Sequence, residues 1–393
     1  MENARRNLIL LACCQALLFT NNVTLIALNG LAGFALTDDK ALATLPVAGY
    51  VVGAALSTYP ASMWMRKAGR RNGFVTGAFF GIAGGAIATL GIYRSSFWTL
   101  VAGTLVLGAY NAFGQYYRFA AADAAPAKWK ARAISLVMAG GLVGGIAGPE
   151  MSKITRELVQ PTFVASYASL VGLCLVTLAI LAGLRIPEPE PREAHGAARE
   201  LGEIMAQPAF IVAAVVAALG YGIMYLLMAA APLAMGFSGH PYAAAAGVMA
   251  AHVVAMFAPS FFTGSFIERF GVLNVMMAGV ATMFACVAVA LSGQLHAHFW
   301  LSLVLLGVGW NFMFVGGTTL LTDACNPSEK AKAQGANEII VFCVTAAGSV
   351  ASGALVNAAG WDTLNYVALP FIAIAGAAIL WLALKRRAAA APA

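Results

Sequence analysis

Two pairs of side chains that could bind a soft metal ion occur in consecutive apolar segments of the chain. One pair is Met224 with Met228, and the other is His252 with Met256. Residues four positions apart lie on one face of a helix, with Cβ atoms about 5–6 Å apart. Thioether sulfur is a soft, neutral donor that favours Cu(I), and imidazole also suits copper. If the two segments are neighbouring helices, the spacing predicts a copper site.

The depth of the two pairs supports this interpretation. If the segments run antiparallel about a turn near residue 239, Met224 lies level with His252. Met228 then lies level with Met249, a candidate additional ligand. Both levels fall near the middle of an apolar segment, where an ionisable side chain such as His252 is a functional candidate by default. Methionine is also a common filler of apolar cores, so simple packing is the competing interpretation for Met224 and Met228.

The composition places these residues in a membrane protein. Of the 393 residues, 61% are apolar and 10% are charged, whereas soluble domains carry about 25% charged residues. A soluble enzyme and a nucleic-acid-binding domain are thereby excluded. The six cysteines form no C-x-x-C pair and no G-x-x-x-x-G-K-[ST] phosphate loop occurs, so neither a zinc site nor ATP chemistry is indicated. No resident cofactor is expected, and copper would be the cargo.

Twelve apolar segments reach the length of about 20 residues that a helix needs to cross the hydrocarbon core. The first six are expected at 8–36, 41–65, 73–93, 96–122, 133–152 and 161–184. The second six are expected at 208–237, 242–267, 272–294, 297–322, 334–358 and 362–384. Most of the 23 Lys and Arg residues fall between spans on the side that holds both chain ends. Because cytoplasmic loops carry an excess of Lys and Arg, both termini are expected in the cytoplasm.

The spans divide into two related halves. Segments 107–133 and 306–333 share a Leu-Gly pair, an Asp, a Pro and a basic Lys-Ala pattern at an offset close to 200 residues. Between the halves, prolines alternate with glutamates over 187–191, and proline cannot continue a helix. We therefore expect an N-terminal half over 1–185, a cytoplasmic linker over 186–206 and a C-terminal half over 207–393 that carries the metal-binding motifs.

A basic turn is also repeated, at 62–71 and again at 264–271. Both copies resemble the G-x-L-a-D-r-x-G-r-r turn of the major facilitator superfamily, with Arg66 at the position of the usual Asp. The residues that match or replace those of the turn are Arg66, Gly69, Arg70, Arg71, Glu268, Arg269 and Gly271. The resemblance implies an all-α membrane protein of the major facilitator fold, with twelve transmembrane helices in two pseudo-symmetric halves. Such proteins bind substrate near the membrane midplane, and the resemblance also implies a monomer.

On such a fold, M-x-x-x-M in the seventh span and H-x-x-x-M in the eighth resemble the CcoA-type copper importers of bacteria. The resemblance implies import of copper across the inner membrane through Met224, Met228, His252 and Met256. It further implies that the imported copper supplies assembly of cbb3-type cytochrome c oxidase. A cytoplasmic copper acceptor is then an additional expected partner, and Cys325 is the cysteine best placed to pass copper inward.

Other polar side chains each admit two interpretations. Arg118, about one turn inside the cytoplasmic edge of the fourth span, could reach the membrane surface or form a gate with Glu338, at similar depth in the eleventh span. His240, His296 and His298 fall in predicted periplasmic turns. They could collect copper there, although most exposed histidines bind no metal.

The alternative function is a proton-coupled exporter of a small amphipathic organic molecule. The methionines would then line an adaptable apolar pocket. The expected mark of this function is a membrane-buried carboxylate near the cavity, and Glu150 lies too near the outer edge of its span for that role. A membrane sensor is a third and weaker interpretation, because no appended signalling domain is recognisable.

Overall fold

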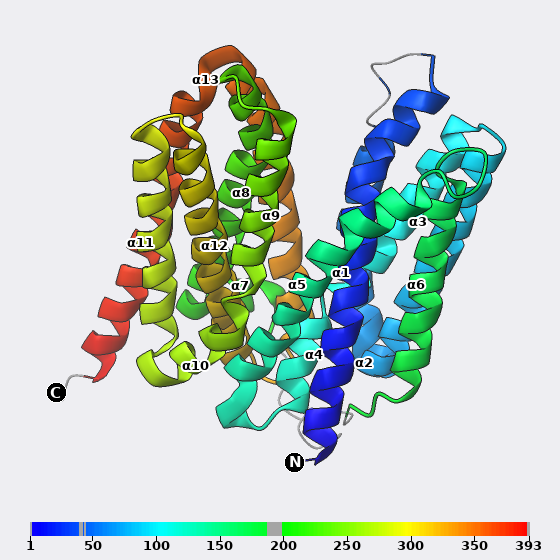
Figure 1. Ribbon diagram of the computed structural model, residues 1–393. Coiled ribbons are helices and arrows are strands. Elements are labelled where there is room, and N and C mark those ends of the chain that lie inside the picture. The colour runs from blue at the N-terminus through cyan, green and yellow to red at the C-terminus, as the bar shows by residue number, and fades with distance from the viewer. Residues whose placement is uncertain (1, 39–41, 43–44, 187–198, 391–393) are drawn as a thin grey trace. The chain divides into compact units, whose positions relative to one another are not determined.

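The computed structural model describes residues 2–38, 42, 45–186 and 199–390, and their regular structure is entirely helical (Figure 1). The first group of helices is α1 (Glu2–Leu36), α2 (Leu45–Tyr93), α3 (Phe97–Gly114), α4 (Tyr117–Ala124), α5 (Lys130–Thr155) and α6 (Val164–Ala182). The second group is α7 (Leu201–Met205), α8 (Pro208–Phe237), α9 (Tyr242–Phe257), α10 (Ser260–Phe270), α11 (Val272–Leu291), α12 (His296–Ala324) and α13 (Lys330–Ala390). The prediction of an all-α membrane protein is confirmed.

Eleven of the described helical stretches are long and apolar enough to cross a membrane. The stretch Leu45–Tyr93 is 49 residues long and breaks at Gly69, where φ is 82°, so it provides two crossings and the expected twelve spans are accounted for. In the second repeat of the basic turn, Gly271 has φ of 86°. Only glycine adopts such backbone angles without a steric penalty. The two copies of the turn therefore share a conformation as well as a sequence pattern.

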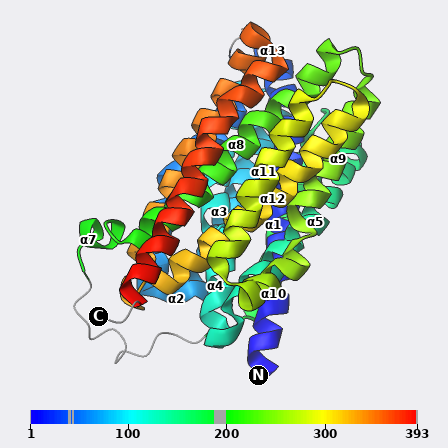
Figure 2. The same cartoon turned by 90° about the vertical axis from the view of Figure 1, so that its left-hand side faces the viewer.

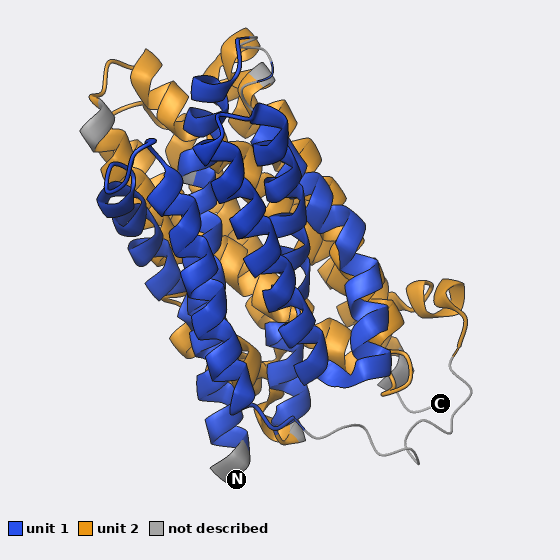
Figure 3. Cartoon of the chain, turned by 90° about the vertical axis from the view of Figure 1, so that its right-hand side faces the viewer, with its two compact units in different colours: residues 1–125, 137–189 blue, residues 126–136, 190–393 orange. Residues whose placement is uncertain are grey.

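The chain forms two compact units, coloured separately in Figure 3. Unit 1 comprises residues 1–125 and 137–189, and unit 2 comprises residues 126–136 and 190–393. Segment 126–136, which the sequence places in the N-terminal half, is thus grouped with unit 2. Of the expected linker, residues 187–198 lie outside the described part of the chain, and residues 201–205 form α7.

Close packing of small residues holds the helices of unit 1 together. A Cβ atom added at Gly140 of α5 would lie 2.3 Å from the carbonyl oxygen of Ala12, and one at Gly144 would lie 2.5 Å from Cβ of Phe19. Both partners belong to α1. In membranes, where lipid is as apolar as the helix surface, such close backbone approach is a main source of helix association.

In unit 2, α8 packs against α12 and α13, and α12 also contacts α9 and α11 (Figure 2). Helix α12 approaches α9 closely at Gly307, where an added Cβ would lie 2.8 Å from the carbonyl oxygen of His252. The absence of a side chain at Gly307 therefore lets the segment that carries His252 and Met256 lie directly against α12.

The start of α5 is joined to unit 2 by several polar contacts. The Ser135 hydroxyl donates to the carbonyl oxygen of Ser260 and accepts from the amide of Gly264 at 3.0 Å. The Arg132 Nε atom lies 2.7 Å from a carboxylate oxygen of Glu268. These contacts explain why the first two turns of α5 are grouped apart from its remaining length.

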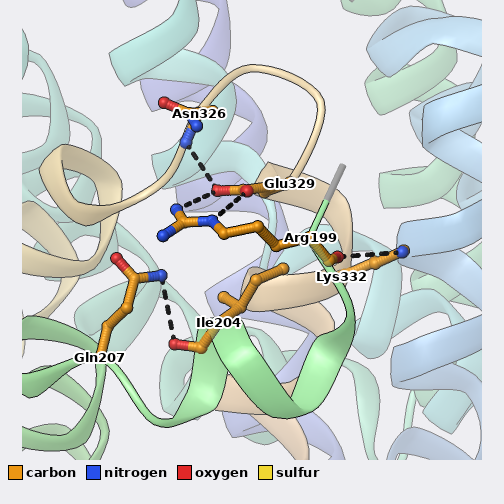
Figure 4. Close-up of polar contacts among 6 residues, drawn as sticks. All are labelled: Arg199, Ile204, Gln207, Asn326, Glu329 and Lys332. Atoms are coloured by element: carbon orange, nitrogen blue, oxygen red, sulfur yellow. Dashed lines mark hydrogen bonds and ion pairs between the residues drawn. The ribbon is translucent and has the colours of Figure 1, made fainter. Parts of the chain in front are cut away.

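Helix α7 is tied to the loop between α12 and α13 by a two-pronged ion pair (Figure 4). Arg199 donates from Nε and Nη2 to the two carboxylate oxygens of Glu329, at 2.6 and 2.8 Å. The Glu329 side chain is only 1% exposed and also accepts from the amide of Asn326. Ile204 of α7 is fully buried. The end of the linker is therefore part of unit 2.

Candidate functional site

The membrane-buried histidine predicted from the sequence is held by the backbone of a neighbouring helix. His252 of α9 is fully buried, and its Nδ1 atom lies 2.7 Å from the carbonyl oxygen of Leu303 in α12. A carbonyl oxygen only accepts hydrogen bonds, so Nδ1 carries the proton and Nε2 keeps its lone pair. Among the described residues, Nε2 has no hydrogen-bond partner. The side chain therefore presents one donor atom of the kind that a metal or a polar substrate group would use.

The methionines of the predicted copper site differ in burial. Met224 and Met256 are buried, whereas Met228 and Met249 are half-buried. The carbonyl oxygen of Met256 accepts a 2.7 Å hydrogen bond from Asn311 of α12. His252 and Met256 are thus both hydrogen-bonded to α12. Met224 and Met228 lie on a different helix, α8. The ligand set remains a prediction.

Five aromatic side chains gather in unit 2, and we call them the aromatic cluster. They are Tyr221, Tyr225, Phe257, Trp310 and Phe314, from α8, α9 and α12. The Trp310 ring stacks on Phe314 with centroids 5.1 Å apart, and Tyr221 meets both rings edge-on at 5.2 and 4.9 Å. Tyr221 and Tyr225 stack at 5.8 Å and are half-buried. Trp310 is fully buried, and among the described residues its Nε1 atom has no hydrogen-bond partner.

Unit 1 contains a series of hydrogen-bonding side chains within its apolar helices. The Tyr50 hydroxyl donates to Asn22, and Asn22 donates to the side-chain oxygen of Asn111 at 3.0 Å. Gln115 donates to the same oxygen at 3.1 Å and accepts from Arg118 at 3.0 Å. We call these five residues the polar chain. It connects α1, α2, α3 and α4 within apolar segments.

The buried charge at Arg118 belongs to this polar chain. Its side chain is 2% exposed and also donates to the carbonyl oxygen of Gln115 at 3.0 Å, which places the guanidinium inside the protein. Glu338 of α13 is buried as well and accepts from Asn337 at 2.8 Å. The gating pair of Arg118 and Glu338 would join the two units and stays a prediction.

The residues of the basic turns make local contacts. Arg70 donates from Nε and Nη2 to Asp123 at 3.1 and 3.0 Å, and Arg71 donates to the carbonyl oxygens of Leu181 and Ala182. Arg66 is exposed, and Arg269 lies over the ring of Phe270. These contacts fix the cytoplasmic ends of helices, which agrees with a structural role for the turns.

Cys325 lies just beyond the end of α12. Burial raises the pKa of its thiol to about 11, with a further contribution from Glu329. The thiol is therefore protonated at neutral pH, whereas the thiolate is the form that binds metals. A bound metal ion would itself deprotonate such a thiol, so the role of Cys325 in passing copper inward stays a prediction.

The aromatic cluster has a recognisable spacing in the sequence. Tyr221 and Tyr225 have the same four-residue spacing as Met224 and Met228, on the same helix, and Trp310 and Phe314 repeat it on α12. The i,i+4 rule applies equally to all three pairs. Helix α8 therefore presents a pair of aromatic rings as well as a pair of methionines at helical spacing.

Comparisons with known proteins identify the family. The family model described as Major Facilitator Superfamily matches residues 8–259 and 213–393. A Brucella anthropi protein named riboflavin transporter RfnT is 43% identical over 393 residues, covering 99% of this chain and 98% of that protein.

Solved structures of transporters have the same fold. The E. coli fucose:proton symporter FucP matches with a TM-score of 0.76 at 15% identity, over 95% of this chain and 98% of that one. The proton:xylose symporter XylE, bound to 6-bromo-6-deoxy-D-glucose, matches with a TM-score of 0.79 at 12% identity over 94% of each chain. At these identities the similarity shows the fold alone.

The family match covers both halves, and the helices provide the multiple crossings of a bacterial inner-membrane protein. The protein is therefore a secondary transporter and not an enzyme, and it belongs to the major facilitator superfamily.

Proposed function

We propose that this protein transports riboflavin, or a small molecule of the same chemical kind, across the bacterial inner membrane. The observation that carries the proposal is the 43% identity to a protein named a riboflavin transporter over essentially the full length of both chains. This cargo belongs to the organic class that the sequence left open as the alternative function. None of the similar proteins described above is named a copper importer.

The chemistry of the two units suits such a cargo. Riboflavin combines a flat three-ring heteroaromatic system with a polyol chain and an edge that resembles an amide. The aromatic cluster supplies ring faces suited to offset or edge-to-face contacts, with Tyr221 and Tyr225 half-buried. The polar chain supplies amide and hydroxyl groups, with Asn22 and Gln115 half-buried.

A buried carboxylate of the kind expected for a proton-coupled organic carrier is present in α13. Glu338 is 1% exposed and accepts a hydrogen bond from the adjacent Asn337. An ionisable side chain within a transmembrane segment is costly and marks proton relays in many pumps and transporters. Glu338 therefore supports coupling of riboflavin movement to a proton gradient, in addition to the gating role predicted from the sequence.

Copper import, with supply of copper to cbb3-type oxidase assembly, is a second candidate function that one observation favours. Nδ1 of His252 donates to a backbone carbonyl, which leaves Nε2 as a free lone pair among the described residues. Metal-binding histidines commonly have their second nitrogen fixed in this way. The same geometry also suits a hydrogen bond to an organic substrate, so His252 alone does not select copper.

The test measures both cargoes in one system. The protein is produced in a bacterial host that cannot synthesise riboflavin, and uptake of labelled riboflavin and of radioactive copper is followed in the same cells. Inverted membrane vesicles preloaded with riboflavin measure flux in the opposite direction. We expect riboflavin flux in one direction, above that of cells carrying the empty vector, and collapse of that flux when a proton ionophore is added.

The outcomes separate the candidates. Riboflavin movement with unchanged copper content supports the proposed function, and its direction distinguishes an importer from the exporter considered above. Copper uptake that is lost in His252→Gln, with riboflavin flux absent in both directions, overturns the proposal in favour of copper import.

A further inference from the structure

Two histidines that are 56 positions apart in the sequence meet on the periplasmic face of unit 2. His240 lies in the turn between α8 and α9, and His296 is the first residue of α12. Their ring centroids are 6.4 Å apart, with the rings inclined at 66°. His240 is partly exposed and His296 is exposed. The pair lies at the end of the helices opposite the basic turns, outside the buried clusters described above.

A hydrogen bond fixes which nitrogen of His240 can accept a metal. Its Nε2 atom lies 2.8 Å from the carbonyl oxygen of Gln294. Because a carbonyl oxygen only accepts, Nε2 carries the proton and Nδ1 keeps the lone pair. The ring also packs edge-on against Phe299, with centroids 5.8 Å apart. Donation of the second N–H to a backbone carbonyl is the usual orienting contact of a metal-binding histidine.

The surrounding charge favours a cation. Gln294 donates from its side chain to a carboxylate oxygen of Asp362 at 3.4 Å, and accepts from the hydroxyl of Ser238 at 2.8 Å. The turns at 238–241 and 292–295 contain neither Lys nor Arg. Following these hydrogen bonds outward from the histidine pair, the first charged side chain is Asp362, which is negative.

We propose that His240 and His296 form a site for a divalent transition-metal ion such as Zn²⁺, with water completing the coordination. Two imidazoles on one tetrahedral ion, at about 2.0–2.1 Å per bond, have centroids about 5 Å apart. The observed separation is 6.4 Å, and binding would require the exposed His296 side chain to move closer to His240. No group of three or more His, Cys, Asp or Glu side chains suited to a metal occurs among the described residues, so the site binds through two imidazoles.

His298 provides a matched control within the same turn. It is two residues from His296, but its Nδ1 atom accepts a hydrogen bond from the amide of Leu295 at 3.2 Å, and its ring packs against Gly293. The lone pair that Nδ1 would offer a metal is therefore already used in capping α12. Replacing His298 removes one imidazole from the surface without removing either proposed ligand.

The test uses the full chain, purified without a polyhistidine tag and reconstituted in lipid nanodiscs. Zn²⁺ alone is titrated by calorimetry, and the unfolding temperature is recorded with and without Zn²⁺, since a ligand that binds the native state raises it. We expect one bound Zn²⁺ and a raised unfolding temperature. His240→Gln and His296→Gln should each lower the affinity for Zn²⁺ about tenfold or more. Substitution of residues that only orient a metal ligand already lowers metal affinity by about this factor. His298→Gln should bind as the unchanged chain does.

Two further measurements keep the outcome decisive. Mg²⁺ prefers oxygen ligands and should produce no shift, and His252→Gln should retain Zn²⁺ binding at the surface. Binding that survives in His240→Gln and His296→Gln, or that disappears in His252→Gln, overturns the proposal. Because the readout is metal binding, it is independent of whether riboflavin transport is found.

Discussion

The two units are built on related scaffolds but have different interiors. Each contains the basic turn with a positive-φ glycine, at Gly69 in one and Gly271 in the other. Beside its buried apolar and aromatic side chains, unit 1 contains the polar chain, which ends at the buried charge of Arg118. Unit 2 contains the aromatic cluster around Trp310, beside buried hydrogen bonds of Asn311. The duplicated scaffold has thus been kept, while the chemistry inside each copy has diverged.

This difference assigns separate tasks to the units. Stacked rings offer broad contact with little directional demand, whereas buried amides and a guanidinium must each find a partner. We therefore expect the aromatic cluster to tolerate changes that keep a ring and to fail when a ring is lost. The polar chain should instead be sensitive to the loss of any single acceptor.

The largest effect is expected from removal of the central ring of the aromatic cluster. Trp310→Ala should abolish most riboflavin flux and cost about 3–5 kcal/mol of stability, as truncation of a buried aromatic usually does. Trp310→Phe keeps a ring and should retain a substantial part of the flux. Uptake per unit of protein in the membrane measures this, and equal flux in both variants would contradict a role of the aromatic cluster in transport.

In unit 1, the sharpest change is loss of the shared acceptor at Asn111. Asn111→Leu leaves the donors of Asn22 and Gln115 without this oxygen, and a buried unsatisfied group costs about 1–3 kcal/mol. The unfolding temperature should fall accordingly. Asn274→Leu is the control, because Asn274 is exposed and donates to the carbonyl oxygen of Phe270, the last residue of the preceding helix α10. A similar loss in both variants would show that the polar chain adds nothing specific.

A smaller effect is expected at the ion pair that ties α7 to unit 2. The Arg199 guanidinium lowers the pKa of Glu329 to about 2. The ion pair therefore contributes its full stability at pH values above the usual pKa range of a carboxyl group. That contribution is lost as the pH falls toward 2. Hydrogen exchange of residues 201–205 should show similar protection, after correction for intrinsic rate, at pH 7 and pH 5, and a progressive loss of protection as the pH falls from the usual carboxylate range toward 2.

Glu329→Gln removes the charge and should reduce that protection at both pH values. If protection in the unchanged chain already disappears between pH 5 and pH 4, Glu329 titrates normally and the ion pair does not hold α7.

The smallest effect on riboflavin transport is expected from replacement of a methionine sulfur atom. Met224→Leu conserves volume, and such exchanges usually cost less than about 1.5 kcal/mol. Riboflavin flux should stay within about twofold of that of the unchanged chain. Copper uptake, if any is found, should fall sharply, because leucine offers no donor atom. The same pair of uptake assays therefore shows whether the thioether or only its bulk matters.

The sequence allowed the helices to be predicted much better than their contacts. Span positions follow from apolar length and basic turns, which are local properties. The depth of His252 in α9 was predictable for the same reason. Its partner was not, because the acceptor is the backbone carbonyl of Leu303, and every residue carries such a group. The meeting of His240 with His296 likewise depends on how α12 packs beside the preceding turn, which no local pattern specifies.

The division of α5 between the units has a mechanical consequence. Its first two turns belong to unit 2 through Ser135 and Arg132, while the rest belongs to unit 1. A single rigid rod cannot follow two bodies that rotate independently. Rotation of one unit against the other therefore requires either that the Ser135 and Arg132 contacts break or that α5 bends near Val137.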